Sequence, residues 1–240
     1  MIVKARAILL HHLRYSDNSL IAHFYTREYG RLSVMVKGIS SRKGSTKYPY
    51  FQPLHIFNIE LYHYENREIH NLKELNLSYI PRNIPGDIRR SSIALFMGEL
   101  LNNIIREEDA NHALYGFIES SVISLDEMSE GISNFHLWFL VTLTAYAGIG
   151  PSSSPKAGFY FDMISGQFTP DPPTHPDYLE PALADLLNRL LKITVDELAD
   201  LHLTGEERTE LLNRVIRYYQ LHLPGIRQIR SLQVLKEIFR

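Results

Sequence analysis

The hydrophobic pattern of the chain changes from strand-like to mainly helical near residue 80, and this change limits the folds that the chain can adopt. Segment 80–87 contains two prolines and a glycine, which interrupt regular structure. Before it, short segments rich in β-branched and aromatic residues alternate with polar turns, and beyond it apolar residues recur at helical spacing. The sequence therefore predicts an α+β protein of two domains, residues 1–80 and residues 81–240.

The first 80 residues contain five predicted strands, which is the strand number of a small barrel. These strands are expected at residues 3–10, 20–26, 31–37, 54–62 and 68–75. Short polar turns separate most of them, whereas the connection 38–53 is long, basic at first and aromatic later. A five-stranded Greek-key barrel of the OB type accommodates this order, and an SH3-like barrel is the nearest competitor.

The remaining residues predict a helical bundle with a small β-hairpin insertion. Helices are expected at residues 88–105, 110–125, 132–147, 182–193, 195–201, 204–221 and 231–239. Residues 132–147 are apolar on nearly all sides, which is typical of a central helix. Asp87 can cap the first helix, and Thr204 with Glu207 has the spacing of a capping box. The proline-rich segment at about 150–181 is the predicted hairpin insertion.

The chain offers no recognisable catalytic or metal-binding motif. It has no cysteine, which excludes disulfides and thiolate zinc sites, and it contains no HExxH, GxSxG or Walker sequence. Four polar residues of the insertion match no ligand spacing and are interpreted as solvated turn residues: Asp162, Asp171, His175 and Asp177. We therefore expect no metal, no cofactor and no enzymatic activity.

The apolar segments of the chain are short. The N-terminal residues lack the apolar run and the cleavage site of a secretion signal, and no later segment has the length of a membrane span. The absence of cysteine gives no sign of an oxidising compartment. Cytoplasmic localisation is therefore the expectation.

The formal net charge of −2 hides a segregated charge pattern. Residues 1–80 hold 11 Lys/Arg against 6 Asp/Glu, residues 81–207 hold 7 against 19, and residues 208–240 hold 7 against 2. Both ends of the chain are thus basic and the middle is acidic. Such local patches govern polyanion binding more than the total charge does, although plain solvated surfaces can have the same pattern.

Residues 26–47 join a patterned strand to a basic loop rich in glycine and serine. Leu32, Val34 and Val36 alternate with polar residues, so one strand face is apolar and must be buried. The cations of this region are then expected to face outward, where a polyanion can release counterions by binding them: Arg27, Arg31, Lys37, Arg42, Lys43 and Lys47. Three tyrosines beside turns and cations are predicted to be exposed and to stack on single-stranded bases: Tyr15, Tyr29 and Tyr48.

A second basic segment lies at the C-terminal end. Its arginines are Arg208, Arg214, Arg217, Arg227 and Arg230. They can add a second polyanion contact or receive an acidic peptide of a partner protein. Structural capping of the helical bundle explains them equally well, so both interpretations stay open.

Three segments carry the most specific sequence motifs of the chain. They read ARAILLHHLRYSDNSLIAHFYTREYGRLSVMVKGISSRKG, FQPLHIFNIELYHYENREIHNLKELNL and YYQLHLPGIRQIRSLQVLKEIF. Together they resemble the RecO family of bacterial recombination mediators in DNA repair. The middle of the chain matches this family mainly in its helical pattern.

The resemblance implies an N-terminal OB domain followed by an α-helical domain, without enzymatic activity. It further implies binding to single- and double-stranded DNA, annealing of complementary strands, and action with RecR to load RecA onto DNA coated by single-strand-binding protein (SSB). The basic OB surface of the family would fall on Arg14, Arg27, Arg31, Lys37, Arg42, Lys43 and Lys47.

The chain departs from the family pattern at residues 150–173. Many members carry a cysteine zinc module there, whereas this chain has no cysteine. The hairpin 159–168 is therefore expected to keep its shape through aromatic packing, without zinc. One functional alternative is a protein–protein interaction scaffold in which the barrel is architectural only. A nuclease is disfavoured because no carboxylate cluster suggests a catalytic metal site.

Overall fold

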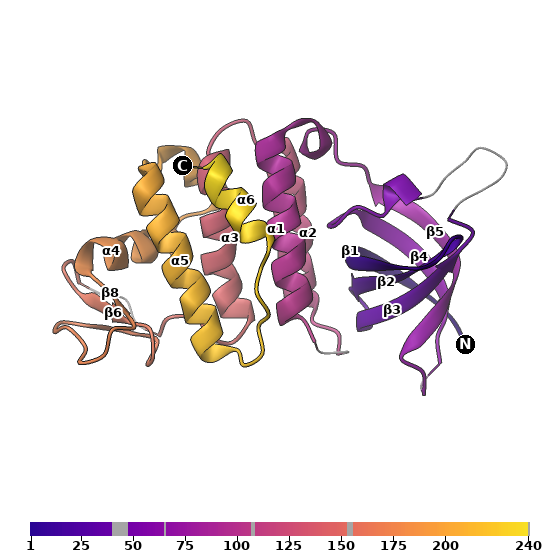
Figure 1. The fold of residues 1–240 in the computed structure, drawn as a ribbon, viewed down its shortest axis with the longest axis horizontal. Coiled ribbons are helices and arrows are strands. Elements are labelled where there is room, and N and C mark those ends of the chain that lie inside the picture. The colour runs from indigo at the N-terminus through magenta and orange to yellow at the C-terminus, as the bar shows by residue number, and fades with distance from the viewer. Residues whose placement is uncertain (40–47, 65, 107–108, 153–155, 240) are drawn as a thin grey trace. The chain divides into compact units, whose positions relative to one another are not determined.

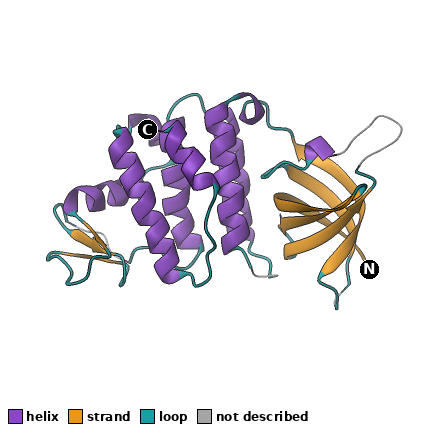
Figure 2. Ribbon diagram, viewed as in Figure 1, coloured by secondary structure: helices purple, strands orange, loops and turns teal. Residues whose placement is uncertain are grey.

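The computed structural model describes residues 1–39, 48–64, 66–106, 109–152 and 156–239 (Figures 1 and 2). The chain divides into two compact units, Met1–Asp126 and Glu127–Arg240, which are described separately below. Strands dominate the start of the first unit, and helices dominate the second.

Five strands close into a barrel at the start of the first unit. They are β1 (Ile2–Ser16), β2 (Ser19–Thr26), β3 (Gly30–Lys37), β4 (Ile56–Tyr62) and β5 (Ile69–Tyr79). Their order around the barrel is β1-β2-β3-β5-β4, and only β3 and β5 pair in parallel among the described strands. This order is OB-like, so the predicted fold class is confirmed.

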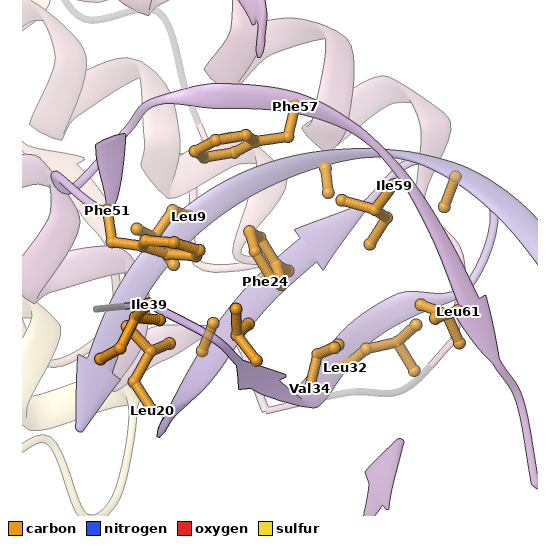
Figure 3. Close-up of a cluster of buried hydrophobic side chains, with 14 of the residues drawn as sticks. Leu9, Leu20, Phe24, Leu32, Val34, Ile39, Phe51, Phe57, Ile59 and Leu61 are labelled. Atoms are coloured by element: carbon orange, nitrogen blue, oxygen red, sulfur yellow. The ribbon is translucent and has the colours of Figure 1, made fainter. Parts of the chain in front are cut away.

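The barrel interior is filled by one face of each strand, as the alternating pattern predicts. Leu32, Val34 and Val36 all belong to the buried cluster, whereas the residues between them are partly exposed (Figure 3). Phe24 meets Phe57 edge to face with their ring centroids 5.8 Å apart. Burial of this apolar surface fixes the register of the strands, because a shift by one residue would turn each apolar face outward.

The outer side of β1 is buried as well. Ile8 and Leu10 alternate with the inward-facing residues, yet both are fully buried. Helix α1 (Ile88–Ile104) packs against β1. Its close approach depends on Gly98, because a Cβ atom there would lie 3.4 Å from the carbonyl oxygen of Leu10 in β1 and 2.9 Å from the Cβ atom of Pro53. Helix α2 (His112–Glu127) contributes Tyr115, whose ring lies 6.1 Å from that of Tyr25.

A buried carboxylate ties the segment between β5 and α1 to the end of α2. Asp126 accepts hydrogen bonds from the Tyr79 hydroxyl (2.9 Å) and from three backbone N–H groups, those of Arg82 (2.9 Å), Asn83 (2.8 Å) and Ile84 (2.8 Å). Burial raises the pKa of Asp126, but the hydrogen bonds outweigh it and leave the pKa below its ordinary value. The 3₁₀ turn η2 (Ile84–Gly86) lies in this segment, and Asp87 then caps α1 as predicted.

The second unit surrounds helix α3 (Ile132–Tyr146), whose buried residues lie on most of its circumference. Around it pack α4 (Pro181–Leu190), the 3₁₀ helix η3 (Val195–Asp200) and α5 (Gly205–His222). The last helix is α6 (Ser231–Ile238). Thr204 and Glu207 form the predicted capping box of α5. The turn over 195–200 is a 3₁₀ helix rather than the expected α-helix.

The insertion is a sheet of three short strands, one more than the predicted hairpin. The strands are β6 (Tyr160–Asp162), β7 (Gln167–Thr169) and β8 (Tyr178–Leu179), in the order β7-β6-β8. Phe161 packs on Phe168 and on Tyr218 of α5, with ring centroids 4.9 Å and 5.5 Å apart. These aromatic contacts support the expectation that packing shapes the hairpin.

Three of the four polar residues interpreted as solvated have partners, so that interpretation is wrong for them. Asp162 accepts a hydrogen bond from the Ile164 N–H (2.8 Å) and lies 3.2 Å from His175 Nε2. Asp177 accepts two hydrogen bonds of 3.0 Å from Arg217. The reason is that the carboxylates satisfy turn amides and a helix cation. Within the described residues no group of three His, Asp or Glu side chains is placed to hold a metal ion.

Candidate nucleic-acid interface

The β2–β3 hairpin separates the predicted DNA-binding residues into two groups. Ser19 pairs with Lys37 at one end of the hairpin, and Thr26 pairs with Gly30 at the other. At about 3.3 Å per residue, these ends are roughly 20 Å apart. The predicted residues therefore do not form one continuous patch.

The first group forms what we call the tip surface, made of Arg14, Tyr15 and Lys37. All three side chains are exposed, and Tyr15 retains 67% of its accessible surface. They belong to the same end of the hairpin, where the Gly38 N–H donates to the Asn18 carbonyl (2.8 Å) and ties the β1–β2 turn to the end of β3. Arg14 lies 3.5 Å from Asp17 in a solvent-exposed ion pair. Such pairs contribute little, so a phosphate can compete for this arginine.

Four predicted residues fall outside what the structure describes in full. Arg42, Lys43 and Lys47 lie in segment 40–47, which is outside the described residues. The backbone of Tyr48 begins the 3₁₀ turn η1 (Tyr48–Tyr50). Their part in DNA binding stays a prediction from the sequence.

The second group, at the opposite end of the hairpin, is more deeply embedded. Arg27 is exposed, as predicted. Tyr29 is half-buried against the barrel core, and its ring centroid lies 5.5 Å from that of His63. It is thus less exposed than expected, since the rings around it cover part of its surface.

Arg31 corrects the expectation that every cation of β3 faces solvent. Its guanidinium donates to the carbonyl and the side-chain oxygen of Asn102, both at 2.9 Å, and to the carbonyl of Ile105. These acceptors lie at the C-terminal end of α1, where backbone carbonyls lack helical partners. Arg31 does point away from the barrel core, but a helix end receives it instead of water.

Three histidines lie between the two groups. His11 pairs with His23 across β1 and β2, their rings are 6.3 Å apart, and His23 Nδ1 lies 3.0 Å from the Ser33 hydroxyl. Partial desolvation lowers the pKa of His11, His12 and His23, and the charge of Arg31 lowers it further for His11 and His23. Both effects favour the neutral form of these rings. This cluster was not predicted from the sequence, because it depends on the register of β1 and β2.

The C-terminal arginines likewise include both exposed side chains and side chains that are hydrogen-bonded or half-buried. Arg208 is half-buried and donates to the carbonyls of Phe239 and Leu203, both at 3.0 Å. Arg217 is paired with Asp177, and Arg214 is half-buried beside Tyr218. Arg227 and Arg230 are exposed. The capping interpretation therefore holds for Arg208, which donates to the Phe239 carbonyl after α6. A surface role fits the exposed Arg227 and Arg230 better than the other three arginines.

The helices of the described residues include none that is long and apolar enough to cross a membrane. An OB-like barrel with an exposed cationic tip, followed by a helical region, defines the class of the protein: OB-fold proteins with an appended helical region. Two family models match the chain: residues 1–80 match "Recombination protein O N terminal" and residues 85–233 match "Recombination protein O C terminal".

Full-length relatives agree with the family models. The chain is 36% identical to the DNA repair protein RecO of Phocaeicola vulgatus and 38% identical to that of Bacteroides fragilis, over the whole length of both chains in each case. The protein named DNA repair protein RecO in Flavobacterium johnsoniae is 36% identical, again over both full chains. The chain belongs to the RecO family of DNA repair proteins.

Proposed function

We propose that the protein is a non-enzymatic recombination mediator that binds single- and double-stranded DNA in the cytoplasm. The observation that carries this proposal is the tip surface, the end of the β2–β3 hairpin at which the side chains of Arg14, Lys37 and Tyr15 are each exposed. Cations of this kind release counterions from a DNA backbone, and an exposed aromatic ring can stack on an unpaired base. Membership of a DNA repair family supports the same proposal.

In this proposal the protein promotes annealing of complementary strands, because binding two strands on one basic surface reduces their mutual repulsion. With RecR it then assists the loading of RecA onto DNA coated by SSB. Arg227 and Arg230 are exposed in the second unit and offer a surface for an acidic partner segment or a second DNA contact.

A salt series with a charge-reversed variant tests the role of the tip surface. We expect Arg14→Glu with Lys37→Glu to weaken binding to single and double strands. The slope of log K against log salt should become shallower by about 0.7 to 0.9 for each lost phosphate contact. The matched control reverses two exposed lysines of the second unit, Lys156→Glu with Lys192→Glu, at the same total charge. Equal slopes in both double variants would contradict the assignment.

A scaffold with an architectural barrel is the second candidate, and a specific observation favours it. Arg31 and Arg6 both contact the helical part of the first unit, Arg31 at the end of α1 and Arg6 at Glu119 of α2. Two cations of the barrel thus serve the fold. Absence of salt-dependent DNA binding by the full chain at low ionic strength would favour the scaffold.

A further inference from the structure

A polar groove of about 520 Å³ opens beside strands β3 and β5 and is distinct from the tip surface. We call it the β3–β5 groove. Residues of the β2–β3 turn, the β4–β5 turn and the end of α1 contribute to its walls. It therefore lies at the end of the hairpin opposite Lys37, where Tyr29 and Arg31 were placed above.

Two sets of aromatic rings line this groove. The ring of His63 lies 5.5 Å from that of Tyr29 and 4.6 Å from that of His70, and the two histidine rings are inclined by only 17°. On the β4–β5 turn, the guanidinium of Arg67 lies over the ring of Tyr64 at 4.6 Å. The Tyr64 N–H donates to His70 Nδ1 at 3.3 Å, which connects the two ring systems. Flat faces of this kind are what a nucleobase stacks on.

The charges of the groove are balanced, which distinguishes it from a phosphate site. Three arginines line it, Arg31, Arg67 and Arg106, and so do three acids, Glu28, Glu68 and Asp109. Arg31 is engaged by α1, as shown above. A phosphate would meet repulsion from the carboxylates, whereas a neutral base with polar edges would not.

We propose that the β3–β5 groove receives one unstacked base of a bound single strand. Tyr64, under Arg67, and the half-buried rings of Tyr29 and His63 provide the platforms, and the buried ring of His70 supports His63 from behind. The carboxylates accept hydrogen bonds from an exocyclic amine. The groove should therefore prefer adenine, cytosine or guanine to thymine, which has no such amine. This inference rests on the proposed function, because the strand must first be bound.

A fluorescent base provides a direct test with the full-length protein. The probe is a thymidine strand of about 15 nucleotides, the upper range for one OB fold, with one central 2-aminopurine and a dye at its end. Anisotropy of the dye reports binding of the strand, and quenching of 2-aminopurine, which carries an exocyclic amine, reports stacking of that base. The variants are Tyr64→Ala and the ring-preserving Tyr64→Phe, with Tyr62→Ala as the control. Tyr62 is 40% exposed on β4 and lies outside the groove lining.

We expect the wild-type protein, Tyr64→Phe and Tyr62→Ala to quench the base, and Tyr64→Ala to lose most of the quenching. An affinity loss of about 5-fold or more for the labelled strand should accompany the loss of one stacking platform. Binding without quenching in the wild-type protein, or undiminished quenching in Tyr64→Ala, would overturn the groove assignment alone. Failure of the wild-type protein to bind the strand would instead overturn the proposed function.

Discussion

The guanidinium of Arg31 donates to oxygen atoms at the end of α1. A cation in a basic segment can therefore have a structural role instead of facing solvent. Arg27 and Arg31 are four positions apart in a basic segment and were predicted to act alike. One is exposed and the other donates to a helix 71 positions away in the sequence. A basic side chain is available to a polyanion only when its N–H groups are not already hydrogen-bonded within the fold.

Replacement of Arg31 by alanine should reduce stability rather than DNA binding. We expect Arg31→Ala to lower the free energy of unfolding by about 2–3 kcal/mol, because charged hydrogen bonds to the carbonyls of α1 are lost. The salt slope of DNA binding should not change. Urea unfolding and a salt titration measure the two quantities.

Arg27→Ala is the matched control. Its side chain is exposed and its backbone hydrogen bond to the Arg6 carbonyl survives the substitution, so stability should change by less than about 0.5 kcal/mol. A shallower salt slope at unchanged stability in Arg31→Ala would mean that this arginine contacts DNA after all.

At the scale of elements, the periodicities predicted most strands and helices within a few residues. Strand β1 extends beyond its predicted end, to Ser16, because its exposed second half is held by pairing with β2 rather than by its own apolar pattern. Strand β8 was missed since it has two residues and exists through pairing with β6. The caps at Asp87 and Thr204 were predictable because capping depends on neighbours in the sequence.

The connection between β5 and α1 depends on one carboxylate that the sequence did not single out. Asp126 lies more than 40 positions beyond the backbone N–H groups that it accepts from. We expect Asp126→Asn to lower the free energy of unfolding by about 1–3 kcal/mol, since the amide cannot accept all four hydrogen bonds. Urea unfolding at pH 7 measures this change.

The pH dependence of the same substitution provides an independent check. The pKa of Asp126 is lowered in the folded protein, so its contribution is complete above the unfolded value of about 4 and is lost as the pH falls through the lower folded value. The stability difference between wild type and Asp126→Asn should therefore narrow as the pH falls below about 4. If the difference in free energy of unfolding stays constant down to pH 3, the negative charge of Asp126 is not the source of its stabilising effect.

At the scale of the whole molecule, the chain forms two compact units, and the helices α1 and α2 belong to the unit that contains the barrel. The outer side of β1 explains this association, because Ile8 and Leu10 are buried although they do not face the barrel interior. Removal of the helices would expose these side chains and Tyr25 to water.

Fragments of the chain test this association. We expect residues 1–130 to unfold cooperatively in urea and residues 1–80 to be poorly folded, because only the longer fragment covers Ile8 and Leu10 and retains Asp126. Tyrosine fluorescence and circular dichroism can follow both fragments. A cooperative transition of residues 1–80 at similar stability would show that the barrel needs no helical cover.

Local sequence patterns were enough to predict the two structural periods, the barrel and its inner face, the helices with their caps, and the RecO-type motifs, because all of these depend on residues close together in the chain. The tertiary structure was needed to show that Arg14 and Lys37 are exposed at the same end of the β2–β3 hairpin, that Arg31 donates to the end of α1, and that Tyr29 joins the rings of the β3–β5 groove. These contacts depend on strand register and helix packing between residues far apart in the sequence, so they cannot be predicted from residue type alone.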